Sequence, residues 1–204
     1  AGKGTNGPII QCAGGLNLTY VTLTNNWNSR SGGGDGAFEH DGGAIHLLNQ
    51  TADGNTNYVT LTNVTIQRCH SEHSGGAIHV HGQFLHRILL QNCTITQCST
   101  RNTSDVQAGG IIRTNGGTNA TLIMDNCEVS KNYTHNVGGV VWWNAYGNKD
   151  SETTGSCTIR NNCRFHHNAA YNDGGAIFNA GADLNVASCQ VYSNEAITGV
   201  GGGI

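Results

Sequence analysis

The sequence predicts an all-β protein, a parallel β-helix (solenoid) of about six coils with three short strands in each coil. Three observations predict this fold: a glycine pair that returns along the chain, an Asn-Cys motif between the pairs, and an alternating segment before each motif. Glycine makes up 30 of the 204 residues. Charged residues reach only 11%, against about 25% in an average globular domain.

The glycine pairs stand directly before apolar residues, as in DGGAIHL at 41–47. Each pair is expected to open the third strand of a coil, at a corner that a Cβ would obstruct. The pairs are separated by 33, 34, 29, 36 and 27 residues and begin at Gly42, Gly75, Gly109, Gly138, Gly174 and Gly201.

Two other repeated segments supply the first and second strands. YVTLTN at 20–25 recurs letter for letter at 58–63, and RILLQN, TLIMDN and DLNVAS occupy the same slot later. Apolar and polar residues alternate in these segments, which is typical of strands with one buried face. The second strand is expected in NVTIQRC, NCTITQC, NCEVSKN, NCRFHHN and SCQVYSN. The asparagine that opens most of them fits a sharp bend, because asparagine tolerates the left-handed conformation well.

Stacked coils bring equivalent residues into contact, so the alignment predicts two ladders of asparagines. Their side-chain amides are expected to hydrogen-bond from coil to coil. The first, here called the corner ladder, consists of Asn63, Asn92, Asn126 and Asn162, with Ser188 as its last member. The second ladder consists of Asn132, Asn168 and Asn194.

The alternation of GGA(I/V/L) with F-x-x-N resembles the repeat of the chlamydial polymorphic outer-membrane protein family. Phe165-His166-His167-Asn168 is followed by Gly174-Gly175-Ala176-Ile177, and the match runs from about residue 42 to the end. Cys69 and Cys98 depart from the pattern, since they stand where other coils have the asparagine. The resemblance implies a right-handed parallel β-helix and an exposed, secreted adhesin passenger.

Eight cysteines raise the question of disulfides. Equivalent residues on adjacent coils have a Cα spacing of about 5 Å, which lies inside the disulfide range. The candidate pairs are Cys69 with Cys98, Cys93 with Cys127, and Cys163 with Cys189. The alternative is a ladder of buried free thiols, which pack well as small apolar groups.

Seven Asn-x-Ser/Thr sequons agree with secretion. Three of them, at Asn63, Asn92 and Asn132, belong to the ladders and are expected to be shielded from glycosylation. The other four fall near predicted loops and are the expected glycosylation sites: Asn17, Asn49, Asn102 and Asn119.

The acidic residues do not form a catalytic pair in the predicted coils. Hydrolysis of a glycosidic bond needs two carboxylates that face each other across the bond. Asp41 and Asp173 both precede a glycine pair but lie four coils apart, and Asp125 and Glu128 flank one bend without a partner carboxylate from a neighbouring coil. No catalytic residue and no cofactor is therefore assigned.

One column of equivalent residues mixes imidazoles, a guanidinium and aromatic rings. Three histidines, His46, His79 and His81, are weak candidates for a metal site, and an exposed polar stripe is the alternative. As a whole the column is a candidate contact face for sugar rings or a neighbouring rod, unless a loop such as 145–156 covers it. It contains His46, His79, Arg113, Trp142 and Phe178; a register shifted by one residue would expose Trp143 instead.

The whole chain is interpreted as a single β-helix domain, with residues 1–16 as an arm or cap, residues 17–204 as coils, and the possibility that it is a segment of a longer chain. A β-helix has to cover its terminal coils, and here the C-terminal GVGGGI carries no polar cap, while the N-terminal segment has one short apolar run, 8–12, that can lie across a partner's coil. The predicted function is therefore a non-enzymatic extracellular or cell-surface structural protein, a protomer or segment of a fibre or adhesin that assembles head to tail with itself. The alternative is a β-helix that binds or acts on carbohydrate, as pectate lyases do.

The partners expected besides a second copy are covalent N-glycans and surface polysaccharide. Nucleic acid is not expected, because the formal net charge is −3. Membrane insertion is not expected either, since no apolar run approaches the roughly 18 residues of a spanning helix.

Overall fold

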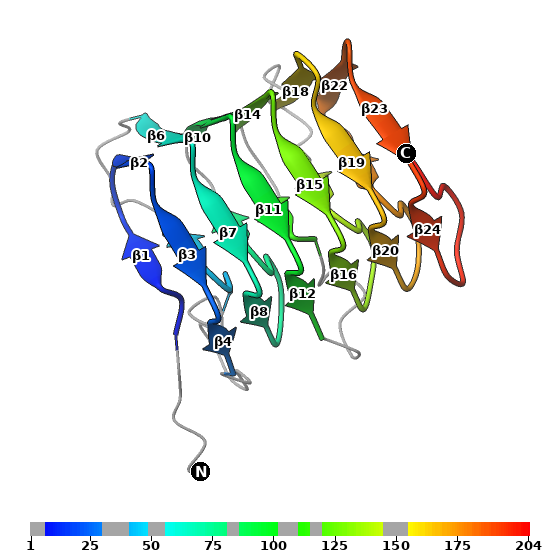
Figure 1. Cartoon of the computed structure of the whole chain (residues 1–204), viewed down its shortest axis with the longest axis horizontal. Coiled ribbons are helices and arrows are strands. Elements are labelled where there is room, and N and C mark those ends of the chain that lie inside the picture. Colours follow the sequence, from blue (N-terminus) through cyan, green and yellow to red (C-terminus); the bar gives the residue numbers. More distant parts are fainter. Residues whose placement is uncertain are drawn as a thin grey trace, which may run out of the picture.

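The computed structural model describes residues 7–29, 41–48, 56–80, 86–101, 110–114, 120–144 and 155–204. It is a right-handed parallel β-helix in which six coils stack in order from the N-terminal to the C-terminal end (Figure 1). The strands of equivalent coils pair in parallel and in register, and they form four sheets of six strands each. The predicted fold class is confirmed. No helix long and apolar enough to cross a membrane is found among the described residues.

Each coil contributes one strand to each sheet, here named A to D in chain order. Sheet A holds the strands that follow the glycine pairs: β1 (Ile10–Cys12), β5 (Ile45–Leu47), β9 (Ile78–Val80), β13 (Ile112–Thr114), β17 (Val141–Asn144) and β21 (Ile177–Ala180). Sheet B holds β2 (Leu16–Thr19), β6 (Asn57–Thr62), β10 (His86–Gln91), β14 (Thr121–Asp125), β18 (Ser156–Arg160) and β22 (Asp183–Val186).

The strands of the other two sheets have three residues in sheet C and two in sheet D. Sheet C holds β3 (Thr22–Thr24), β7 (Thr65–Gln67), β11 (Thr94–Thr96), β15 (Glu128–Ser130), β19 (Arg164–His166) and β23 (Gln190–Tyr192). Sheet D holds β4 (Trp27–Asn28), β8 (His70–Ser71), β12 (Ser99–Thr100), β16 (Tyr133–Thr134), β20 (Ala169–Ala170) and β24 (Glu195–Ala196). A coil therefore has four strands and not the three that the sequence predicts.

The fourth strand arises because a second left-handed residue turns the chain after sheet C. One such residue precedes every strand of sheet D by two positions: Asn25, Arg68, Gln97, Lys131, His167 and Ser193, all with φ between 51° and 57°. Two extended residues then pair with the coils on either side before the chain moves on to the glycine pair. A two-residue strand is too short to show alternation in a sequence.

The two copies of YVTLTN do not occupy the same slot. The second copy forms β6 in sheet B, whereas the first copy forms β3 in sheet C, where Leu23 pairs with Ile66. The partner of β6 in the first coil is LNLT, since Leu16 pairs with Val59. The common slot expected for the two copies is therefore wrong. The first coil also begins earlier than expected, because β1 lies inside the proposed arm (1–16) and pairs with β5.

The glycine pairs form the corner that leads into sheet A, as predicted. The first glycine of most pairs is left-handed, with φ of 80° at Gly42 and 70° at Gly138, whereas in the pair 109–110 it is the second glycine, Gly110, that is left-handed, with φ of 66°. The second glycine lies against the backbone of the next coil: a Cβ on Gly76 would come within 2.7 Å of the Ser99 carbonyl oxygen, and one on Gly139 would overlap the carbonyl of Gly175. The pair thus sets how closely the coils stack.

The number of residues between a sheet C strand and the following sheet D strand is the same in every coil, whereas the connections on either side of sheet A vary in length. The last residue of every sheet C strand and the first residue of the following sheet D strand are three positions apart, as in Gln67 and His70. The connections on either side of sheet A differ in length from coil to coil, for example from Cys12 to Leu16 and from Asn144 to Ser156. The uneven repeat of the glycine pairs comes from these connections.

The core is one apolar column inside the coils. Inward residues of sheets A, B and C alternate with outward ones, and those of the middle coils are fully buried, for example Ile78, Leu90 and Phe165. In the first and last coils most of the equivalent residues are only partly buried, for example Leu18 and Val191, although Leu23 and Ile177 are buried.

Candidate functional site

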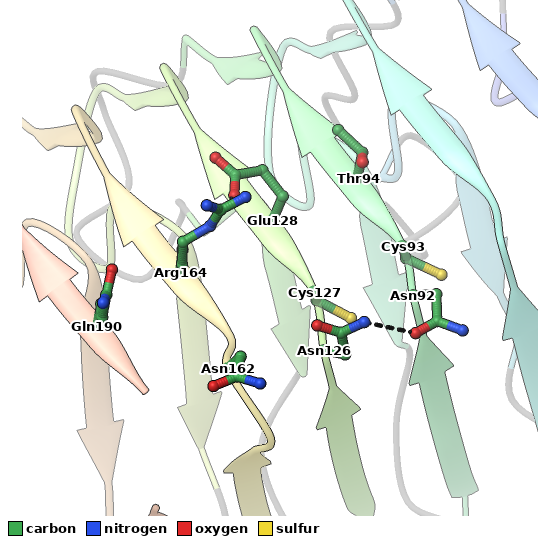
Figure 2. A pocket seen from close by; sticks show the side chains of 9 residues that line it. All are labelled: Asn92, Cys93, Thr94, Asn126, Cys127, Glu128, Asn162, Arg164 and Gln190. Atoms are coloured by element: carbon green, nitrogen blue, oxygen red, sulfur yellow. Dashed lines mark hydrogen bonds and ion pairs between the residues drawn. The ribbon is translucent and has the colours of Figure 1, made fainter. Parts of the chain in front are cut away.

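A polar groove follows the corner between sheets B and C across coils 3 to 6. Its volume is about 510 Å³, and Figure 2 shows the side chains that line it. They are Asn92, Cys93, Thr94, Asn126, Cys127, Glu128, Asn162, Arg164 and Gln190. Three of these asparagines belong to the predicted corner ladder, but the sequence pattern does not indicate a groove.

The corner ladder places a row of amides along the groove. Asn92, Asn126 and Asn162 all adopt the left-handed conformation, with φ of 51°, 52° and 63°, and all three are exposed. The amide nitrogen of Asn126 donates to the side-chain oxygen of Asn92 at 2.8 Å. Coil-to-coil bonding is therefore confirmed for this pair, but the ladder lies on the surface. Asn92 is not shielded as expected, and Asn63 is only half-buried.

The second ladder lies inside the molecule and is fully bonded. Asn132 and Asn168 are each 1% exposed. Each amide nitrogen donates to the amide oxygen of the next coil, Asn132 to Asn168 at 3.0 Å and Asn168 to Asn194 at 2.9 Å. Each also donates to a carbonyl of the preceding coil, as Asn168 does to Val129 at 3.0 Å. This ladder is confirmed, and Asn132 is shielded as predicted.

The carboxylates beside the groove are paired with arginines of the next coil. Glu128 contacts Arg164 at 2.7 Å and also the His166 ring. Asp125 contacts Arg160 at 2.9 Å. The carboxylates therefore face guanidinium groups and not each other. This arrangement does not offer the two facing carboxylates that glycosidic hydrolysis needs.

An aromatic platform adjoins the groove on sheet C. The rings of His166 and Tyr192 stack with centroids 5.0 Å apart and an interplanar angle of 12°. Their strands are β19 and β23, two residues along from Arg164 and Gln190 of the groove. Tyr192 is 44% exposed, so one ring of this platform is open to a ligand.

The predicted contact face is a true column, but it is buried. Register pairing joins His46 to His79, His79 to Arg113, Arg113 to Trp142 and Trp142 to Phe178. The first four are at most 5% exposed, and Phe178 is half-buried. The expected exposure is therefore wrong, and the alternative of a covered column agrees with the burial. Trp143 is also buried, in the core.

Inside this column the contacts are between rings and a guanidinium. The carbon of the Arg113 guanidinium lies 4.3 Å from the centre of a Trp142 ring, and the ring centroids of His46 and His79 are 5.1 Å apart. His81, the third metal candidate, lies outside the described residues. Within the described ranges, no group of three His, Cys, Asp or Glu side chains could hold a metal ion.

Asp41 joins this column to the next coil, a contact that the sequence pattern does not predict. It is fully buried, and its carboxylate lies 2.6 Å from the His73 ring and 3.2 Å from the His79 ring. Ser74 donates to it from its backbone nitrogen and, at 2.7 Å, from its hydroxyl. Burial alone would raise the pKa of Asp41, but the charge of His79 and the hydrogen bonds from His73 and Ser74 outweigh it and hold the pKa well below its usual range.

This depressed pKa predicts a loss of stability in acid. The carboxyl contributes stability above its unfolded pKa of about 3.9 and loses it as the pH falls toward the lower folded value. We expect Asp41→Asn to be clearly less stable than the wild type at pH 7, and the gap to narrow at pH 3. Urea unfolding at pH 7, 5 and 3 measures the difference in free energy of unfolding between the wild type and Asp41→Asn.

Asp173→Asn is the matched control, because Asp173 accepts the equivalent backbone bond, from Val200 at 2.8 Å, and has no histidine partner among the described residues. Its effect on stability should change less with pH. A gap between wild type and Asp41→Asn that is the same at all three pH values would contradict the assigned role of the charge.

All eight cysteines are free thiols in the structure. The members of each predicted pair do lie next to one another on adjacent coils, but no disulfide joins them, so the structure agrees with the ladder of thiols. Cys127 lies between Cys163 and Cys93, and hydrogen bonds with both raise the pKa of its thiol. Burial raises the pKa of Cys157 to about 12.

One of the four expected glycosylation sites can be placed. Asn17 is exposed in β2. Asn49, Asn102 and Asn119 lie outside the described residues.

Comparison of the chain with protein-family models, with curated proteins and with solved structures found no match.

Proposed function

We propose that the chain is a non-enzymatic extracellular structural protein, a protomer or segment of a surface fibre or adhesin that assembles through the ends of the β-helix. The supporting observation is the match between the terminal coils. Coil 6 presents strands β22 to β24 in the same order in which coil 1 presents β2 to β4, and residues 200–203 already begin a further turn by accepting bonds from Gly174, Gly175 and Ile177, so the ends can stack on a further coil with the register seen throughout. That coil can belong to the same chain or to a second copy.

The terminal coils also present apolar groups for such a contact. Near the last coil, Ile197, Val200 and Ile204 are 46%, 77% and 60% exposed. Burial of one such side chain contributes about 1.5 to 3 kcal/mol. Unpaired strand edges recruit further strands, and a head-to-tail contact that does not close on itself produces a filament.

Electron microscopy of the undenatured protein over a range of concentrations tests the proposal. We expect filaments with an axial repeat of about 30 Å, the length of six coils at the spacing of paired strands. Val200→Lys should shorten or abolish them, because it places a charge in the contact.

Tyr58→Lys is the matched control. It puts the same charge on a side chain that is 63% exposed on the side of the rod and leaves both ends unchanged. Single particles at every concentration, or filaments that Val200→Lys does not affect, would contradict assembly through the ends.

The remaining parts of the proposal rest on sequence features. An extracellular location is supported by the sequons, and Asn17 is accessible to a glycan. Oxidation of adjacent thiols would tie neighbouring coils together in that compartment. Adhesion is supported by the family resemblance. The catalytic alternative is less well supported, because Asp125 and Glu128 are each paired with an arginine.

A further inference from the structure

We propose that the groove between sheets B and C binds a neutral oligosaccharide along the axis of the rod. This inference can be tested apart from assembly through the ends, because the corner amides lie on the side of coils 3 to 5 and only Gln190 and Tyr192 belong to the terminal coil; binding is measured on the unassembled protein. Three properties support it: free amide groups in a row, a balanced charge, and an adjoining aromatic ring.

The amides supply both donors and acceptors. After the bond between Asn126 and Asn92, the amide nitrogen of Asn92 and the oxygen of Asn126 make no hydrogen bond within the described structure, and neither do the side chains of Asn162 and Gln190. A sugar hydroxyl both donates and accepts, so it matches an amide better than a purely anionic or cationic group does. The repeat of the coils presents these amides at a regular spacing.

The charges favour a neutral ligand. The guanidinium of Arg164 is already paired with Glu128 at 2.7 Å, and that of Arg160 with Asp125 at 2.9 Å. Neither sign is in excess among these four groups. A polyanion would have to compete with the carboxylates for the arginines, whereas a neutral sugar can accept from the guanidinium nitrogens that remain.

The platform of His166 and Tyr192 offers a surface for a sugar ring. Tyr192 is 44% exposed, and its face is held parallel to the His166 ring beneath it. Stacking of the apolar face of a sugar on this ring would bury apolar area without ordering a flexible side chain, because the tyrosine is already positioned. Hydroxyls at the ring edge would then reach the amides and Gln190.

Isothermal titration calorimetry with cellohexaose, chitohexaose and mannohexaose as probes tests the proposal, with a galacturonate hexamer as the anionic comparison. We expect at least one neutral probe to bind with a Kd of about 1 mM or tighter. Asn126→Gly should weaken that binding about fivefold or more, since it removes one hydrogen-bonding group, and Tyr192→Ala should do the same. Glycine is used at residue 126 because it keeps the left-handed backbone.

The controls use the same substitutions outside the groove. Asn63→Gly changes a left-handed corner asparagine that does not line the groove, and Tyr58→Ala removes an exposed ring from sheet B. Both should bind as the wild type does. The proposal is overturned if no neutral probe binds, if only the galacturonate binds, or if both groove variants bind as tightly as the controls.

Discussion

Replacement of Gly139 by alanine is expected to destabilise the protein by about 3 to 5 kcal/mol, or to prevent folding. Gly139 is not in the left-handed region, so alanine is compatible with its backbone conformation. The damage comes from the new methyl group, which would overlap the carbonyl of Gly175 in the next coil. The overlap is between backbone atoms, so no side-chain rotation relieves it, and coils 5 and 6 would have to move apart.

Thermal unfolding of the purified variants measures this effect. For a chain of this size the loss corresponds to a fall in Tm of roughly 6 to 20 °C. Gly203→Ala is the control, because a Cβ there would meet only Val191 Cγ1 at 3.5 Å, an ordinary contact. A loss below about 1 kcal/mol for Gly139→Ala would mean that the coils can separate locally at low cost.

Asn168→Ala is the second substitution with a large expected effect. The side-chain oxygen of Asn168 accepts from the backbone and side-chain nitrogens of Asn132 at 3.1 and 3.0 Å, and its nitrogen donates to Val129 and Asn194. Alanine would leave the buried backbone nitrogen of Asn132 without this partner and would remove one further bond each from the Asn132 amide nitrogen, the Val129 carbonyl and the Asn194 amide oxygen; the first and last of these keep Ile95 and the Asn168 backbone nitrogen. An unsatisfied buried group costs about 1 to 3 kcal/mol and each lost bond about 1 kcal/mol, so we expect a loss of about 3 kcal/mol.

Replacement of Asn168 by cysteine separates the hydrogen bond that the side chain donates from those that it accepts. Cys98 occupies the equivalent place and donates its thiol to the Ile66 carbonyl of the preceding coil at 3.8 Å, while its backbone nitrogen donates to Asn132. Asn168→Cys can therefore keep a weak bond to Val129 and offers Asn132 only a weak sulfur acceptor, of the kind that Cys163 offers the Cys127 backbone nitrogen at 3.2 Å. We expect its loss of stability, measured by urea unfolding, to fall between those of wild type and Asn168→Ala.

Asn185→Ala is the control for both variants, since Asn185 is exposed on the outer face of sheet B. It should change stability by less than about 0.5 kcal/mol. If Asn168→Ala were equally mild, water or a shift of the neighbouring coil would have to satisfy the buried amides.

The sequence predicted those features that the stacking of coils repeats at every turn. The glycine corners and the second asparagine ladder recur because the same steric and hydrogen-bonding demand recurs in each coil. The fourth strand was missed because two residues carry no periodic pattern. The position of the first YVTLTN segment in the coil was predicted wrongly because the same residues can form a strand of sheet B or of sheet C. Only the pairing of β3 with β7 shows that the segment belongs to sheet C.

The candidate site was harder to predict, because it depends on contacts that are not periodic. Burial of the column from His46 to Trp142 depends on what covers sheet A. The carboxylate of Asp41 contacts the rings of His73 and His79 only once adjacent coils have stacked. The groove depends on which corner amides remain free after the coils have stacked. The corner motif placed Asn92 and Asn126 correctly in one ladder, but it contained no information on their exposure.

The constant spacing between sheets C and D has an evolutionary consequence. At these corners a single left-handed residue turns the chain, so an inserted residue would shift the following strand out of register with both neighbouring coils. The connections on either side of sheet A already differ from coil to coil and can absorb insertions without such a shift. Descendants of this chain can therefore acquire new segments along the two borders of sheet A, while the corner between sheets C and D stays free of them and changes only by substitution.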